Sequence, residues 1–271
     1  SNYLKKKNID KKICFVGSHV QALPIETLKK EMSIDFVFTN EGVYALRNIL
    51  KLNSFNYDDL KNIKGIALRD KTGKPQINNP EKIVPSNRMD IDLPGYAWDL
   101  LPYKNKPLDL YRSPMWHAEY NFNKRSPYAS IQTSLGCVFK CNFCMINLIN
   151  RNNNSEIGVA SEYSNMRFWS TDFIIKEFDK LISMGVKTIR IVDEMFLLNP
   201  KYYIPLCEKL ALRNKDDSLR LWSYSRIDTV KRPDILKLVR KAGIKWLCLG
   251  IESGDKKVRL EVAKGKFEDV D

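Results

Sequence analysis

Short apolar runs alternate with helical patterns along the first third of the chain. The runs with the length and composition of buried strands are residues 13–16, 34–38 and 63–68. The stretches with apolar positions at helical spacing between them are residues 24–31 and 43–52. Strands that alternate with helices usually pair in parallel, so residues 1–90 are predicted to form part of a doubly wound α/β sheet.

Residues 91–127 break this pattern. They have little periodicity and are rich in Pro, Tyr and Asp. The segment is too apolar to be a free tether, so we expect an extended connector that packs on its neighbours through its aromatic side chains.

Alternation returns in residues 128–271. The predicted strands are residues 131–134, 188–193, 219–224 and 246–251. The predicted helices are residues 171–184, 200–213 and 233–242, with another that begins near residue 256. Four strand–helix units in about 140 residues favour a curved parallel sheet, the partial form of a β/α barrel.

The composition is that of an ordinary globular protein, with 44% hydrophobic residues among 271. It excludes a disordered chain and a disulfide-stapled miniprotein, and no apolar run is long enough to span a membrane. The formal charge of +13 is spread along the sequence among acidic residues. We therefore expect a basic solvated surface rather than a nucleic-acid site, and a cytoplasmic protein.

Three of the six cysteines fall within eight residues: Cys137, Cys141 and Cys144. This spacing suits a metal site in a reducing compartment better than a disulfide framework. A structural zinc site normally has four protein ligands, and neither His19 nor His117 stands at a suitable spacing to be the fourth. The other cysteines are isolated, and Cys207 and Cys248 are expected in the core.

Three thiolates leave one iron of a 4Fe–4S cluster open to a small molecule. The CxxxCxxC pattern after a barrel strand resembles that of the radical S-adenosylmethionine (SAM) enzymes. The resemblance implies that Cys137, Cys141 and Cys144 hold the cluster and that SAM chelates the open iron. It also implies reductive cleavage of SAM to methionine and a 5′-deoxyadenosyl radical that abstracts hydrogen from the substrate.

Polar residues at later strand ends match places where this family contacts SAM. Asp193 and Glu194 stand where members of the family bind the amino group of the methionyl part of SAM. The planar guanidinium of Arg226 suits pairing with a carboxylate. Glu252 and Ser253 stand where ribose hydroxyls are contacted. Phe143 resembles the aromatic residue whose backbone lies near the adenine.

Residues 1–90 and the connector resemble the cobalamin-binding domain that precedes the barrel in one large subgroup of the family. Two small-residue turns follow the first two predicted strands and are the expected cobalamin contacts: Gly17, Ser18, Thr39, Glu41 and Gly42. The histidine motif that supplies an axial ligand in many cobalamin proteins is absent, and His19 is not assigned that role. Both domains have fewer strands than the family pattern, so the chain is expected to be shortened at both ends.

The resemblance predicts a cobalamin-dependent methyltransferase that acts on an unactivated centre of a small-molecule, natural-product or lipid-like substrate. A flavodoxin or ferredoxin would supply electrons. The alternatives are a radical SAM oxidative cyclase or rearrangement enzyme, a methylthiotransferase, and a non-enzymatic zinc-loop protein that binds nucleic acid.

Overall fold

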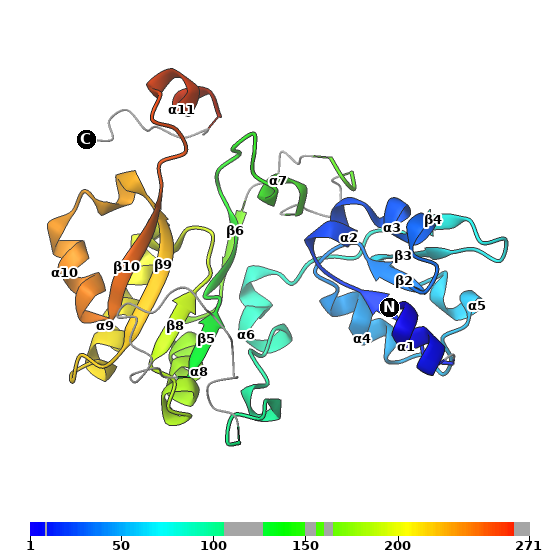
Figure 1. Ribbon diagram of the computed structural model, residues 1–271, viewed down its shortest axis with the longest axis horizontal. Helices are drawn as coiled ribbons and strands as arrows, with labels where there is room; N and C mark the ends of the chain where they lie inside the picture. The colour runs from blue at the N-terminus through cyan, green and yellow to red at the C-terminus, as the bar shows by residue number, and fades with distance from the viewer. Residues whose placement is uncertain (9, 106–126, 150–155, 160–164, 263–271) are drawn as a thin grey trace. The chain divides into compact units, whose positions relative to one another are not determined.

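The computed structural model describes residues 1–8, 10–105, 127–149, 156–159 and 165–262 (Figure 1). Contacts between residues divide the chain into two compact units. The amino-terminal unit contains residues 1–85 and 143–165, and the barrel unit contains residues 86–142 and 166–271. Most of the predicted connector, residues 106–126, lies outside the described residues.

The amino-terminal unit is built on a four-stranded sheet with the strand order β1-β2-β3-β4. Its strands are β1 (Cys14–Phe15), β2 (Phe36–Phe38), β3 (Ile66–Arg69) and β4 (Pro75–Ile77). Its helices are α1 (Asn2–Lys7), α2 (Ser18–Ala22), α3 (Pro24–Lys30), α4 (Val43–Ile49), α5 (Tyr57–Leu60) and α7 (Ile146–Ile149).

Successive side chains of β2 point to opposite faces of this sheet, and each face is covered by an apolar cluster. Phe36 and Phe38 pack with Ile49 of α4 in one apolar cluster. Val37 packs with Leu28 of α3 in another. Helices on two faces of one sheet are the expected doubly wound arrangement.

The strand directions differ in part from the prediction. β1 and β2 are parallel, as expected, whereas β3 runs antiparallel to β2 and forms a hairpin with β4. Two helices, α4 and α5, pack on the same face between β2 and β3, since Ile49 and Leu60 share one cluster. Two helices thus separate β2 from β3 where a parallel strand–helix–strand unit has one.

The barrel unit contains four parallel strands in the order β10-β9-β8-β5 (Figure 1). These are β5 (Tyr128–Ile131), β8 (Thr188–Ile191), β9 (Arg220–Arg226) and β10 (Ile244–Gly250), and β6 (Ser134–Cys137) pairs with β7 (Asn165–Phe168) in a separate sheet. The α-helices are α6 (Met89–Asp92), α8 (Thr171–Ser183), α9 (Pro200–Arg213), α10 (Pro233–Lys241) and α11 (Lys256–Val262). The 3₁₀ helices are η1 (Ser86–Arg88), η2 (Trp98–Leu100), η5 (Phe196–Leu198) and η6 (Ile227–Val230).

The strands of the barrel unit have one fully buried face and one more open face. Ile189, Ile191 and Leu221 are at most 1% exposed, and α10 packs against β10. Cys248 lies in register with Tyr224 and is exposed, so the prediction that it is a core residue is wrong. Cys207, on α9, is buried as predicted.

One predicted strand, residues 131–134, divides into two. β5 ends at Ile131 and joins the parallel sheet, whereas β6 begins at Ser134 and joins β7. The Cys cluster therefore follows β6 rather than the first strand of the parallel sheet. Gln132 and Thr133 form the connection between these two strands.

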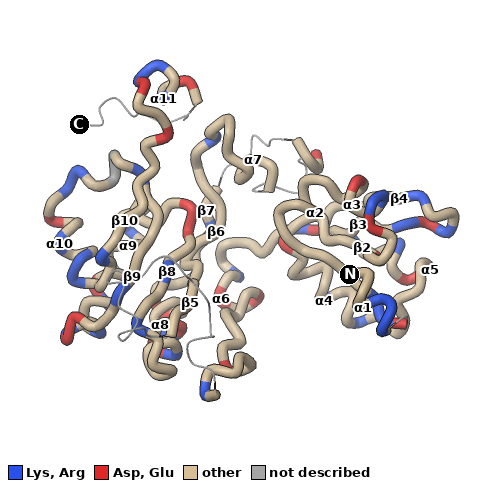
Figure 2. Tube along the Cα trace, viewed as in Figure 1, with Lys and Arg blue, Asp and Glu red and all other residues tan. Residues whose placement is uncertain are grey.

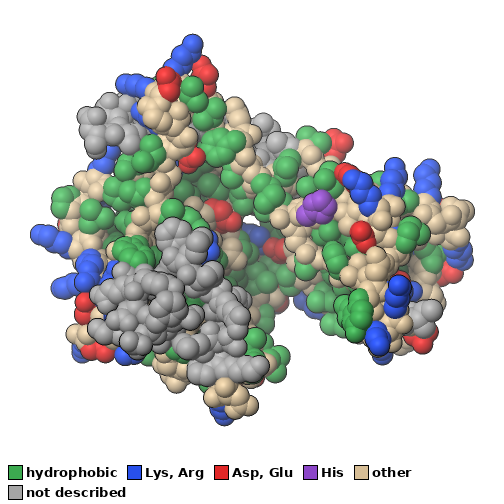
Figure 3. Space-filling model, in the orientation of Figure 1, with side chains coloured by type: hydrophobic (Ala, Val, Ile, Leu, Met, Phe, Trp, Pro, Cys, Tyr) green, Lys and Arg blue, Asp and Glu red, His purple; other side chains and the backbone are tan. Residues whose placement is uncertain are grey.

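Charge is distributed over both units. Lys and Arg lie among Asp and Glu along the trace (Figure 2), and the face in Figure 3 shows them interspersed with hydrophobic side chains. Across the described part of the chain, no helix combines the length and the apolarity that crossing a membrane requires.

Candidate functional site

The carboxyl ends of β6, β8, β9 and β10 carry most of the predicted site residues of the barrel unit. Cys137 ends β6 and is 7% exposed, and Cys141 lies half-buried in the loop that follows. Cys144 is also half-buried, but it falls in the amino-terminal unit. Among the described residues, no three His, Cys, Asp or Glu side chains are gathered as ligands around one point.

The donor set of the Cys loop fits an iron–sulfur cluster. Three thiols stand within eight residues, and the backbone N–H of Phe139 donates to Cys137 Sγ at 3.4 Å. Hydrogen bonds to cysteine sulfur stabilise thiolates and tune cluster potentials. The guanidinium of Arg226, at the end of β9, stacks on the Phe139 ring with its Cζ 4.1 Å from the ring centroid. A buried cation thus lies against the loop.

Two adjacent carboxylates after β8 have different surroundings. Asp193 is 1% exposed and accepts hydrogen bonds from Thr133 N, Thr133 Oγ1 and Ser134 Oγ. Burial raises the pKa of Asp193, and those hydrogen bonds oppose the rise. Glu194 has a buried Oε2 with no hydrogen-bond partner among the described residues. Burial raises the pKa of Glu194 to about 7.

The residues after β10 form a polar turn. Glu252 is exposed and has a positive φ of 68°, and Ser253 Oγ accepts a hydrogen bond from Asp255 N. The backbone carbonyl of Val262, at the end of α11, accepts from Asn142 N at 3.1 Å. The helix after β10 therefore contacts the Cys loop. Phe143, the predicted adenine neighbour, is 58% exposed and belongs to the amino-terminal unit.

The predicted cobalamin contacts of the amino-terminal unit lie at one edge of its sheet. β1 and β2 are parallel, so the turns that follow them, with Gly17 and Ser18 in one and Thr39, Glu41 and Gly42 in the other, meet at their carboxyl ends. A groove of about 490 Å³ there is lined by Val16, Phe38, Glu41, Gly42, Val43, Leu46, Arg47, Leu50 and Lys51.

This groove is apolar but open. Val16 is 60% exposed, Leu46 44% and Leu50 71%. Gly42 has a φ of +77°, and a Cβ there would lie 3.0 Å from the Phe38 ring, so the turn requires glycine. Thr39 is 3% exposed and Glu41 accepts a hydrogen bond from Val84 N, so both hold the turn in shape.

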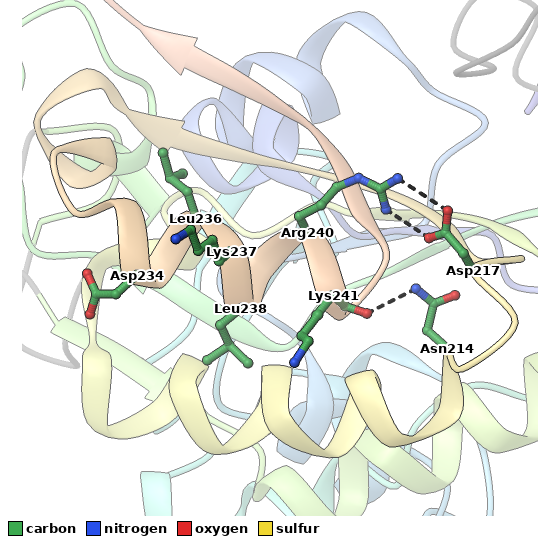
Figure 4. Close-up of a pocket in the computed structure, with 8 residues that line it drawn as sticks. All are labelled: Asn214, Asp217, Asp234, Leu236, Lys237, Leu238, Arg240 and Lys241. Carbon is green, nitrogen blue, oxygen red and sulfur yellow. Dashed lines mark hydrogen bonds and ion pairs between the residues drawn. The ribbon is translucent and has the colours of Figure 1, made fainter.

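A second groove, of about 870 Å³, runs along α10 from Asp234 near its start to Asn214 and Asp217, which precede β9 (Figure 4). Arg240 pairs with Asp217 beside it, and Asn214 donates to the carbonyl of Lys241. Catalytic groups of parallel sheets gather at the carboxyl ends of the strands, so this groove is not the candidate site.

Sequence reasoning missed several residues that support the site. Tyr96 Oη accepts from Gln132 N at 2.9 Å, and Tyr202 Oη donates to Thr133 O at 2.9 Å. Glu177 of α8 is 2% exposed and accepts from Trp98 Nε1 at 3.1 Å. The only sequence signal for Glu177 is a charge on the apolar stripe of a helix.

Fold and site together define an α/β protein in which Cys137 ends β6 of the barrel unit and Cys141 and Cys144 follow within seven residues. Residues 131–271, more than half of the chain, match the radical SAM superfamily, and the chain belongs to that superfamily. Membership implies a 4Fe–4S cluster and SAM. It also favours an enzyme over the zinc-loop alternative.

Three similarities extend over nearly all of the chain. An uncharacterized methyltransferase of Pyrococcus horikoshii is 28% identical over 96% of this chain and 50% of its own length. The anaerobic magnesium-protoporphyrin IX monomethyl ester cyclase of a Synechocystis strain is 24% identical over 91% of this chain and 43% of its own. The chain thus spans half or less of these relatives.

The third similarity is to a solved structure. The cobalamin-dependent SAM radical enzyme OxsB, with aqua-cobalamin and SAM bound, superposes with a TM-score of 0.68. The match covers 98% of this chain and 34% of that chain at 18% identity. It confirms the predicted fold class, with both parts of the chain included.

Proposed function

We propose that the protein is a radical SAM methyltransferase that uses cobalamin. The observation that carries the SAM-binding part of the proposal is Glu194, which follows β8 and has a buried Oε2 with no hydrogen-bond partner among the described residues. An unpaired buried carboxylate is costly, and a cationic ammonium would relieve that cost. The methyltransferase relative supports the reaction type.

Each residue then has a role in holding SAM. The thiolates of Cys137, Cys141 and Cys144 hold the cluster, which when reduced supplies the electron that cleaves the SAM sulfonium. Glu194 accepts the methionyl ammonium, and the Arg226 fork pairs with the carboxylate. Glu252 and Ser253 face the ribose, and Phe143 faces the adenine.

Glu194 makes SAM affinity depend on pH. The carboxyl is neutral below its pKa of about 7 and ionised above it. Because an ammonium prefers the ionised form, affinity is expected to rise about fivefold from about pH 6 to about pH 7.5, where most of the SAM α-amino group is still protonated. Replacing Glu194 with Gln should weaken binding about tenfold at about pH 7.5 and flatten the profile.

The measurement is electron paramagnetic resonance (EPR) of the anaerobically reconstituted, dithionite-reduced protein, titrated with SAM at each pH. The cluster signal should shift on SAM addition, and 5′-deoxyadenosine should form. A protein that holds one zinc and no cluster would overturn the proposed function. An unchanged pH profile in Glu194→Gln would remove Glu194 from the site.

The groove of the amino-terminal unit is the proposed cobalamin site. Its exposed apolar lining suits the face of a large flat ring, and Gly42 in its lining suits close backbone approach. The predicted contacts Gly17, Ser18 and Thr39, in contrast, are not among the lining residues.

Cobalamin binding can be tested in the groove by adding a charge. Leu46→Glu should lower hydroxocobalamin affinity about tenfold, because a carboxylate in an apolar contact is desolvated without a partner. Met32→Glu is the control, since Met32 is also exposed, at 70%, and lies outside the groove. Absorbance titration with hydroxocobalamin gives the dissociation constants of the two variants. Equal affinity in Leu46→Glu and the control would place cobalamin elsewhere.

A radical cyclase is the second candidate because of the cyclase relative. SAM labelled on its methyl group separates the two. A methyltransferase transfers the label to the corrinoid, whereas a cyclase leaves it on the released methionine. In either case we propose a small-molecule, natural-product or lipid-like substrate and a flavodoxin or ferredoxin as reductant.

A further inference from the structure

Gln132, Thr133 and Ser134 carry the chain from β5 into β6, the strand that ends in Cys137. We call these three residues the β5–β6 bridge. They are held from three other elements: Tyr96 from the segment before η2, Asp193 after β8, and Tyr202 from α9. Cys137 lies only three residues beyond the bridge, so its position depends on how firmly the bridge is held.

Asp193 makes more hydrogen bonds to the β5–β6 bridge than either tyrosine. Its Oδ1 accepts from Thr133 N at 2.6 Å, and its Oδ2 accepts from Thr133 Oγ1 at 2.5 Å and from Ser134 Oγ at 2.7 Å. Thr133 and Ser134 are both 0% exposed. Charge-assisted hydrogen bonds are short and strong, so this set fixes the bridge in one geometry.

The neighbouring carboxylate provides the contrast. Asp193 is 1% exposed and both of its oxygens are occupied, whereas Glu194 keeps an oxygen with no hydrogen-bond partner among the described residues. An ammonium group would have to displace hydroxyl donors to reach Asp193. At Glu194 Oε2 it would displace no hydrogen-bond donor of the described residues.

We propose that Asp193 is a positioning residue, which holds the Cys137 strand through the β5–β6 bridge, and that Glu194 alone receives the SAM ammonium. The inference rests on the proposed function only for the role of Glu194. The anchoring role revises the sequence-based expectation that Asp193 contacts SAM. It predicts that loss of Asp193 loosens the Cys loop and leaves SAM recognition intact.

The variant Asp193→Asn tests the anchor with almost no change in volume. The Asn oxygen can still accept from Thr133 N, but the NH₂ group at the other position requires the Thr133 and Ser134 hydroxyls to accept instead of donate, so weaker neutral hydrogen bonds replace the charge-assisted set. Reconstituted protein should lose its cluster to a chelator about tenfold faster than wild type, as outer-shell substitutions do. The SAM dissociation constant of the fraction that keeps its cluster should be unchanged.

Glu194→Gln is the matched variant and should show the reverse pattern, with normal cluster retention and weakened SAM binding. An Asp193→Asn protein that keeps its cluster at the wild-type rate but loses SAM affinity would overturn the assignment. Circular dichroism checks folding. If Asp193→Asn does not fold, Ser134→Ala removes a single hydrogen bond of the same set and should speed cluster loss to a smaller extent. A folded Ser134→Ala protein with wild-type retention would also overturn it.

A second readout does not need the cluster. Alkylation of Cys137 in the cluster-free protein, followed by mass spectrometry, reports how well the bridge holds that strand. Asp193→Asn should speed the alkylation of Cys137, which is 7% exposed, but not that of the exposed Cys248. Equal Cys137 rates in wild type and variant would overturn the anchor even if the proposed function fails.

Discussion

Cys141→Ala is expected to abolish the 4Fe–4S EPR signal of the anaerobically reconstituted, dithionite-reduced protein. The loop offers three thiolates to a cluster, and removing one leaves two, too few to retain it. SAM cleavage should fall to background for the same reason. The measurements are iron and sulfide per protein, the EPR signal with and without SAM, and 5′-deoxyadenosine formation.

Cys248→Ala is the control because it too removes one thiol, and Cys248 is exposed and lies outside the loop. It should retain the wild-type iron content and signal. A Cys141→Ala protein that kept the signal would contradict the assignment of the three-cysteine loop. A Cys248→Ala protein that lost the signal would point to a different ligand set.

Glu177→Ala is expected to destabilise the protein by about 3 kcal/mol. The carboxylate is 2% exposed, accepts from Trp98 Nε1 at 3.1 Å and pairs with Lys180 Nζ at 2.5 Å. Truncation removes the charge-assisted hydrogen bond that a buried indole N–H donates to the carboxylate, and it removes the ion pair with Lys180, a combination that costs roughly 2–4 kcal/mol. Urea unfolding of the whole chain, followed by circular dichroism, gives the difference.

Glu208→Ala controls for removing a glutamate from a helix of the same unit. Glu208 is exposed on α9, and surface substitutions usually change stability by less than about 0.5 kcal/mol. Equal unfolding midpoints for Glu177→Ala and Glu208→Ala would show that the Glu177–Trp98 contact contributes nothing measurable.

Periodicity predicted most of the elements because buried strands and helices leave a local pattern. Helix α9 spans the predicted residues 200–213, with Pro200 at its first position. Strand direction leaves no such pattern. β3 runs antiparallel to β2 where two helices precede it instead of one, and neither α5 nor the hairpin strand β4 has enough residues to show a period.

In the site, too, features within one short segment could be predicted, and contacts between distant segments could not. The Cys loop was visible because its chemistry lies in one short segment. The different roles of Asp193 and Glu194 were not, because both are acids after a strand, and only the hydroxyls of Thr133 and Ser134, about 60 residues earlier in the chain, distinguish them. Cys248 was misassigned because an apolar strand does not reveal which of its faces is covered.

The segment before η2 decides where the barrel unit can be cut. Gly95 approaches Glu177 so closely that a Cβ would lie 2.9 Å from its Cδ, and Tyr96 stacks on Trp98 while its hydroxyl caps Gln132. A fragment that began at Tyr128, where the parallel sheet begins, would expose the Glu177 carboxylate and uncap the bridge. A stable excised barrel unit should therefore start at Ser86. Gly95, Tyr96 and Trp98 are then part of its packed structure and do not act as a free linker.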